Sequence, residues 1–158
     1  MKRRPLIGKV NISFTTDSWK NIKKSVPHLK LGGESFSSTN NTIKDDVAII
    51  IAYRNRDYHL KIFLGHIHQI LLRQGIHYRI FVISQDDDRK FNRAMLFNVG
   101  FVEALKLGHW SCFIFHDVDL LPENDHNTYN CSIMPKHMSV AVDTMKYKLP
   151  YDEIFGGE

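Results

Sequence analysis

The stretch Val47-Ala48-Ile49-Ile50-Ile51 decides the fold class of this chain. An unbroken apolar run that is rich in β-branched residues is typical of a strand buried on both faces, as in a parallel sheet. Parallel strands are joined by crossovers, and these crossovers are usually helices. The run therefore predicts an α/β fold, with helices between this strand and the next ones.

The segments that follow alternate between helical and strand patterns. Apolar residues at helical spacing extend from Leu60 to Leu71, and Gly75 closes this segment. The further expected elements are a strand at 78–84, a helix at 92–107, a strand at 110–115 and a fourth strand at 139–142. This alternation predicts an α/β domain with right-handed crossovers.

The first 45 residues lack a sustained hydrophobic period. They are rich in Ser, Thr, Asn, Lys and Gly, and Gly32-Gly33 together with residues 35–42 are typical of a loop or linker. We therefore expect a stem-like or irregular segment over residues 1–45 and a folded domain over residues 46–158.

The composition is that of a globular domain without a membrane span. Of the 158 residues, 43% are hydrophobic and 24% are charged, which argues against wholesale disorder. The longest apolar run, residues 47–52, is far shorter than the roughly 20 residues that cross a bilayer. No apolar run follows the basic start, so we expect no signal peptide in this chain.

The chain is slightly basic, with a net charge of +4. Such a charge suits an anionic partner, although a basic solvated surface explains it as well. Because the sequence has no long stripe of Lys and Arg and no nucleic-acid-binding signature, we expect no nucleic acid partner.

Three polar clusters follow the predicted strands. They are residues 54–57, 86–88 and 116–119. Ligands of open α/β sheets bind beyond the carboxyl ends of the strands, where these clusters are expected to converge. The sequence therefore predicts a ligand site at that edge of the sheet.

Two pairs of aspartates have the spacing of a metal half-site. Asp117 and Asp119 lie two residues apart, so in an extended strand both carboxylates face the same way, as Mg²⁺ or Mn²⁺ would require. Asp86 and Asp88 have the same spacing, and the pattern alone does not choose between the pairs. Residues 86–90 look more like a self-neutralising solvated loop, so we place the metal at Asp117 and Asp119.

Four other residues near these clusters suit a nucleotide. Arg54 and Arg56 share a face in an extended segment and could hold phosphate oxygens, or they could pair with neighbouring aspartates such as Asp57. Phe91 and Arg93 flank the predicted second helix, where a ring and a guanidinium could stack on a base. The alternative for Phe91 is a hydrophobic staple.

The two cysteines, Cys112 and Cys131, lie 19 residues apart on either side of the aspartate cluster. A disulfide between them would clamp the loop that carries Asp117 and Asp119, and the alternative is two free buried thiols. Three glycosylation sequons favour an oxidising compartment and hence the disulfide. Their acceptors are Asn11, Asn40 and Asn130.

Four motifs together resemble the β-1,4-galactosyltransferase family, also called glycosyltransferase family 7. They are Tyr53-Arg54-Asn55-Arg56, the run 91–101, the run 115–127, and Leu149-Pro150-Tyr151 with Phe155-Gly156-Gly157. Their order and spacing resemble the family's from about residue 31 to residue 157, and the motifs are long and specific.

The resemblance implies a GT-A fold, a Rossmann-like and mostly parallel sheet with flanking helices, incomplete here at the C-terminus. Residues 46–158 would form the N-terminal, UDP-sugar-binding part of a catalytic domain. The implied reaction is a Mn²⁺-dependent, inverting transfer of Gal or GalNAc from a UDP-sugar to a terminal GlcNAc- or glucose-type acceptor in glycoprotein or glycolipid glycan synthesis.

The resemblance also implies roles for individual residues. The expected donor pocket for uridine and pyrophosphate comprises Tyr53, Arg54, Arg56, Phe91 and Arg93. Asp117 and Val118 are expected on the ribose side, Asp119 as the metal ligand, and Cys112 with Cys131 at the family's disulfide positions. Acceptor contact and donor specificity are expected at Tyr151, Ile154 and Gly157.

The chain also departs from the family pattern. The family's general base lies beyond the position of Glu158, so we expect the 158-residue chain to be inactive alone. The resemblance implies a type II membrane protein of the Golgi lumen whose anchor is not in this chain. The alternative is a non-catalytic UDP-binding or interaction module that ends at residue 158.

Overall fold

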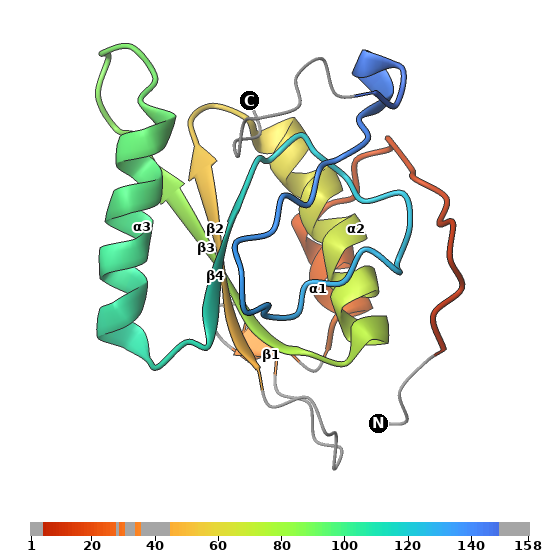
Figure 1. Ribbon diagram of the computed structural model, residues 1–158. Coiled ribbons are helices and arrows are strands. Elements are labelled where there is room, and N and C mark those ends of the chain that lie inside the picture. The colour runs from red at the N-terminus through yellow and green to blue at the C-terminus, as the bar shows by residue number, and fades with distance from the viewer. Residues whose placement is uncertain (1–4, 28, 31–33, 36–44, 149–158) are drawn as a thin grey trace.

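The structure is a computed structural model that describes residues 5–27, 29–30, 34–35 and 45–148 (Figure 1). Its elements are α1 (Trp19–Ser25), β1 (Glu34–Ser35), β2 (Asp46–Tyr53), α2 (Asp57–Gln74), β3 (His77–Ser84), α3 (Arg93–Leu107), β4 (Cys112–His116) and the 3-10 turn η1 (Asp143–Met145). The strands form one sheet in the order β1-β3-β2-β4, in which β2 is parallel to β3 and β4, and β1 is antiparallel to β3. The α/β fold predicted from the sequence is therefore confirmed.

The strand β2 lies inside the sheet and is buried along its length. Residues 47–52 are all buried, and Ile49 pairs with Ile80 of β3 on one side and with Ile114 of β4 on the other. Burial on both faces explains why every position in this run is apolar. The sequence prediction for this strand is confirmed.

The helices α2 and α3 cover opposite faces of the sheet (Figure 1). One apolar cluster joins Val47, Ile49 and Ile51 to α2, whereas the other joins Ala48 and Ile50 to α3. This split follows from the alternation of side chains along β2. The helix α2 ends at Gly75 as predicted, because Gly75 adopts a left-handed conformation (φ 67°) in which its N–H bonds to the Leu71 carbonyl.

The N-terminal part of the chain is more ordered than its composition predicts. It contains α1, which begins after the Ser18 cap and buries Ile22 against the domain, and β1, which extends the sheet beside β3. Residues 5–17 lie extended along α2 (Figure 1). The segment over residues 1–45, expected to be stem-like or irregular, therefore contains a helix and a short strand that its composition did not indicate.

The fourth strand expected at 139–142 is absent from the described residues. This segment lies outside the sheet, and Val140 is 58% exposed. The Val142 carbonyl instead accepts hydrogen bonds from the N–H groups of Met145 and Tyr147, which closes η1. Four small or β-branched residues do not form a strand when no neighbouring strand pairs with them.

No described helix is long and apolar enough to cross a bilayer.

Candidate functional site

The carboxyl ends of β2, β3 and β4 meet at one edge of the sheet, as predicted. Their last residues are Tyr53, Ser84 and His116, and the polar clusters follow directly. The Gln85 N–H donates to the Tyr53 carbonyl (3.0 Å), which joins the ends of β3 and β2 beyond the ladder. The three clusters are therefore brought together.

Asp117 is held by Arg93 across the edge of the sheet. The Arg93 Nε and Nη2 atoms donate to the two Asp117 carboxylate oxygens at 2.6 and 2.9 Å. The guanidinium also lies over the Phe97 ring, 4.8 Å from its centroid. Bidentate pairing fixes both side chains and joins the first turn of α3 to the end of β4.

Asp119 is the more available of the two predicted metal-binding carboxylates. Its side chain is half-exposed, and its ion pair with the half-exposed Arg56 is long, at 3.8 Å. Asp117, in contrast, is largely buried under Arg93. Within the described part of the chain this long ion pair is the contact that Asp119 makes, so its carboxylate oxygens remain accessible to a ligand.

The extended geometry expected for Asp117 and Asp119 is wrong. The strand β4 ends at His116, and Val118 and Asp119 form a turn in which Val118 is buried in the α2 cluster. The turn sends Asp117 toward α3 and Asp119 toward the start of α2. The two carboxylates therefore have different partners and do not form the predicted paired half-site.

Arg54 and Arg56 also diverge, although they were expected to share a face. Arg54 lies over the Phe91 ring (5.3 Å to the centroid), and its Nη1 atom donates to the Arg89 carbonyl at 2.5 Å. Phe91 is 43% exposed, so its ring remains accessible beside a guanidinium. The reason for the divergence is Asn55, whose positive φ of 52° turns the backbone between the two arginines.

Tyr53 holds the start of α2. Its hydroxyl donates to the Asp57 carboxylate at 2.6 Å, and this hydrogen bond raises the pKa of Tyr53, with burial and the Asp57 charge acting the same way. Asp57 is therefore bonded to Tyr53, and the pairing of Arg54 or Arg56 with Asp57 considered from the sequence is not formed.

The loop after β3 is organised by Gln85, a residue that the sequence analysis missed. Its Nε2 atom donates to Asp87 (2.6 Å) and to the Lys90 carbonyl (3.2 Å), and its Oε1 atom accepts from the Asn92 N–H (2.9 Å). The exposed Asp87–Arg89 pair agrees with the predicted self-neutralising loop. Gln85 directly follows the strand β3, and this position was the feature of the sequence that could have indicated its role.

His116 and Tyr129 form a hydrogen-bonded pair beside Asp117 that the sequence did not reveal. The His116 Nδ1–H donates to the Asp117 carbonyl (2.7 Å), and its Nε2 atom accepts from the Tyr129 hydroxyl (2.8 Å). Burial lowers the pKa of His116 and raises that of Tyr129, so both groups are neutral. Together they hold the turn that carries Asp119.

The disulfide between Cys112 and Cys131 is confirmed. The two Cα atoms lie 5.6 Å apart, and the described cysteines include no free thiol. The Cys131 N–H donates to the Asp45 carboxylate (3.0 Å), so the end of the loop is tied to the start of β2. The bridge encloses the turn that carries Asp117 and Asp119.

Three predicted specificity residues, Tyr151, Ile154 and Gly157, lie outside the described residues. Among the described residues, no group of three or more His, Cys, Asp and Glu side chains could hold a metal ion. Asp119 could therefore supply one metal ligand from this part of the chain, with the others supplied by a bound phosphate or by other groups.

The model of the N-terminal region of glycosyl transferase group 7 matches residues 1–132. The chain belongs to this family. Because the match begins at residue 1, it includes the segment that the composition suggested was a stem.

Curated relatives include β-1,4-galactosyltransferase 1 from Bos taurus, 47% identical over 96% of this chain, and β-1,4-galactosyltransferase 4 from Homo sapiens, 53% identical over 70% of it. The chain spans 38% and 32% of the lengths of these two relatives.

A solved structure of Drosophila β-1,4-galactosyltransferase 7 in complex with manganese, UDP-Gal and xylobiose is 38% identical. The similarity covers 56% of this chain and 36% of that one, with a TM-score of 0.51. The fold of this chain is thus similar to that of a galactosyltransferase structure.

Proposed function

We propose that this chain is the donor-binding part of a Mn²⁺-dependent, inverting β-1,4-glycosyltransferase. The proposed donor is a UDP-sugar, and the proposed acceptor is a glycan that ends in a GlcNAc- or glucose-type sugar. The relatives named above are galactosyltransferases, and one of them binds manganese, UDP-Gal and xylobiose, which supports this choice.

The observation that carries the proposal is the half-exposed, weakly paired carboxylate of Asp119 at the carboxyl edge of the sheet, where three arginines are also found. Arg56 lies 3.8 Å from Asp119, Arg93 is fixed by Asp117, and Arg54 lies over Phe91. A divalent cation and a diphosphate need this combination of one hard oxygen ligand and several cationic donors.

Asp119 suits Mn²⁺ as one of the several ligands that this ion takes. Carboxylate oxygen is a preferred ligand of Mn²⁺, and Asp119 is half-exposed, which leaves room for phosphate oxygens on the same ion. When bound, the metal would stabilise the negative charge that develops on the UDP leaving group.

The chain's own side chains would bind and orient the nucleotide. We assign Phe91, with its exposed ring, to the uracil, and Arg54 and Arg56 to the diphosphate. Asp117 and Val118 would lie on the ribose side, with Arg93 holding Asp117 in place. Tyr53 would keep the turn between β2 and α2 in position through Asp57.

The test is UDP binding, because this chain need not be active to bind. We expect Mn²⁺ to strengthen UDP binding to the purified chain. Asp119→Asn should reduce that Mn²⁺-dependent gain by at least roughly tenfold, because changing a residue that only supports a metal ligand already costs about 10–100-fold in metal affinity. Isothermal titration with and without Mn²⁺ measures both effects.

The matched control is Asp88→Asn, which removes one exposed carboxylate from the other Asp-x-Asp pair and should leave Mn²⁺-dependent binding unchanged. Equal losses in the two variants would contradict the assignment of the metal to Asp119. Binding of UDP that does not respond to Mn²⁺ in the unchanged protein would contradict metal-assisted binding.

The donor sugar is proposed to be GalNAc in preference to Gal. The family resemblance implies that the position of Ile154 holds a tyrosine in galactose-transferring members, beside C2 of the donor sugar. Isoleucine is smaller and has no hydroxyl, so it leaves room for an N-acetyl group. Differences of a few atoms in a pocket are worth only about 1–3 kcal/mol, so the expected result is a preference of roughly 10–200-fold.

This preference is measured on the catalytic domain with its C-terminal continuation restored, using UDP-Gal and UDP-GalNAc with a GlcNAc-terminated acceptor. Ile154→Tyr is expected to shift the ratio toward UDP-Gal, and Ile154→Leu serves as the control without a hydroxyl. A clear preference of the unchanged enzyme for UDP-Gal would refute the assignment.

The proposed location is the Golgi lumen, where a disulfide such as Cys112–Cys131 persists. A non-catalytic UDP-binding module is the second candidate function, since the features that favour nucleotide binding do not require transfer. The restored domain discriminates between the two, because a module would bind UDP and transfer no sugar.

A further inference from the structure

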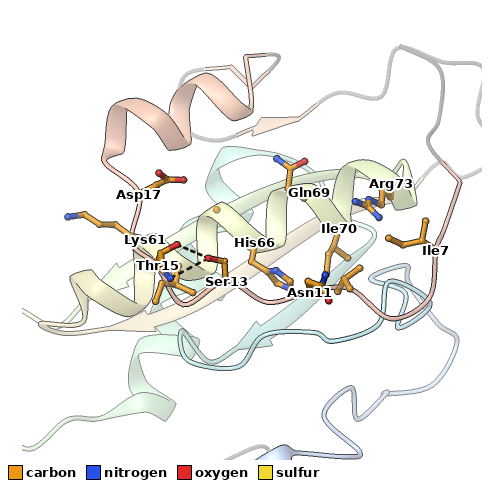
Figure 2. Close-up of a pocket in the computed structure, with 13 residues that line it drawn as sticks. Ile7, Asn11, Ser13, Thr15, Asp17, Lys61, His66, Gln69, Ile70 and Arg73 are labelled. Atoms are coloured by element: carbon orange, nitrogen blue, oxygen red, sulfur yellow. Dashed lines mark hydrogen bonds between the residues drawn. The ribbon is translucent and has the colours of Figure 1, made fainter.

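A groove separate from the carboxyl edge of the sheet lies between the N-terminal segment and α2 (Figure 2). Its volume is about 430 Å³, and its walls are residues 7–17 and residues 61–73. Nothing in the proposed donor site uses this groove. Its most distinctive residue is Asn11, which lines it and begins the sequon Asn11-Ile12-Ser13.

The backbone around Asn11 is held firmly. The Asp125 carboxylate accepts hydrogen bonds from the N–H groups of Ile7 and Gly8, and the Val10 N–H donates to the Glu123 carbonyl at 2.8 Å. Exposed and half-buried residues alternate from residue 5 to residue 13, as in a strand laid on a surface. Asn11 is on the exposed row, so its position is fixed while its side chain is accessible.

The Asn11 amide is also free to be modified. Within the described part of the chain, its side chain makes no hydrogen bond, whereas the hydroxyls of Ser13 and Thr15 bond to each other at 2.7 Å (Figure 2). An exposed, unbonded asparagine in a sequon tolerates a bulky substituent in the folded state.

We propose that Asn11 carries an N-linked glycan whose first sugars lie in this groove. In the modification, the side-chain amide nitrogen bonds to the anomeric carbon of a polyisoprenoid-diphosphate-linked oligosaccharide. The bond from that carbon to the diphosphate breaks, the lipid diphosphate leaves, and the amide loses one proton to a base of the transferring enzyme.

The groove has the chemistry that a sugar requires. Gln69 and Ser13 offer hydrogen-bonding groups, and the buried residues Ile62 and Ile70 add apolar side chains to the lining. Lys61 and Arg73 lie toward opposite ends of the groove (Figure 2). A pyranose presents hydroxyls at its rim and C–H groups on its face, so mixed walls of this kind suit it. The glycan is already tethered at Asn11, which removes most of the entropic cost of binding there.

Asn130 provides an internal comparison. Its side-chain oxygen accepts a hydrogen bond from the Thr128 hydroxyl at 2.5 Å, and the middle residue of its sequon, Cys131, is in the disulfide. A sequon clamped in this way should be modified poorly, although Asn130 is exposed. A comparison of glycan occupancy at Asn11 and Asn130 therefore distinguishes the effect of local geometry from the effect of having the motif.

The inference requires passage through the secretory pathway and does not depend on donor binding, so its failure would leave the UDP-binding test unaffected. The chain is expressed behind a cleavable secretory leader in mammalian cells, and glycan occupancy is measured by peptide mass spectrometry. We expect the occupancy of Asn11 to exceed that of Asn130 several-fold, with Asn11→Gln and Asn130→Gln as references. An unmodified Asn11 in the secreted protein would overturn the proposal.

Seating in the groove is tested by the rate at which an amidase releases the glycan from the folded protein. No atom lies within 4 Å of a Cβ built on Gly65, which lines the groove, so Gly65→Tyr would place a ring where the sugars lie. We expect several-fold faster release from Gly65→Tyr and from Gln69→Ala than from the unchanged protein, and no change in Gly65→Ala. Equal release rates in all four proteins would overturn the seating of the glycan.

Discussion

Replacing Asp125 with alanine is expected to lower the free energy of unfolding by about 3–5 kcal/mol, the range for removal of one partner from a buried charged pair. The Asp125 side chain is fully buried and accepts from the N–H groups of Ile7 (3.0 and 3.1 Å) and Gly8 (2.8 Å), with Arg73 at 3.6 Å. The substitution leaves two backbone donors and one guanidinium without this partner. Chemical denaturation measures the loss.

The control for this substitution is Asp86→Ala, which removes an exposed carboxylate and should change stability by no more than about 0.5 kcal/mol. Similar losses in the two variants would show that the contacts of Asp125 do not stabilise the fold. Asp125→Asn retains the shape and one acceptor, so its loss should be intermediate.

The contribution of Asp125 also depends on pH. Burial opposes its ionisation, but the hydrogen bonds from Ile7 and Gly8 and the charges of Arg73 and His126 outweigh burial and lower its pKa. Since the folded pKa is lower than the unfolded one, the stabilisation is fully present above the unfolded pKa of about 3.9 and is lost as the pH falls through the folded pKa. The stability difference from Asp125→Ala should therefore be constant near neutral pH and decrease in acid.

The sequence could predict those parts of the fold that local patterns encode. The structure confirms three features that follow from local sequence patterns: the burial of residues 47–52, the helix α2, and the end of this helix at Gly75. The first two follow from the spacing of apolar residues, and the third follows from the left-handed conformation that glycine adopts readily. The link between Ile7 and Asp125 joins residues 118 positions apart, and no local pattern encodes such a contact. The order of the N-terminal segment was missed for this reason.

The location of the candidate site could be predicted from the sequence, but the contacts between its side chains could not. Polar residues after three parallel strands must meet at one edge, so the location followed from topology. The partners of Asp117 and Asp119 depend on a turn at Val118, whose side chain is buried. The sequence-based prediction assumed an extended backbone at this point and therefore did not include the turn. Gln85 and Tyr129 act through hydrogen bonds to distant or irregular segments, which residue type alone does not reveal.

Replacing Gly100 with valine is expected to lower the free energy of unfolding by about 3 kcal/mol, at the upper end of the usual cost of overpacking. A Cβ atom at this position would lie 2.3 Å from Ile50 Cγ2 and 2.8 Å from Ile83 Cγ1, and Ile50 is fully buried in the central strand β2. Either α3 must move away from the sheet or the isoleucines must leave their preferred rotamers.

The matched substitution is Gly65→Val in α2, where an added Cβ would meet no atom within 4 Å and the cost should stay below about 0.5 kcal/mol. Because the first turn of α3 carries Arg93, which holds Asp117, a displaced α3 should also weaken UDP binding at temperatures where Gly100→Val remains folded. Thermal unfolding and UDP titration of both variants test this link. Unchanged UDP binding in a destabilised Gly100→Val would mean that the close packing of α3 on β2 serves stability alone, and that Arg93 keeps its place through Asp117 and Phe97 without it.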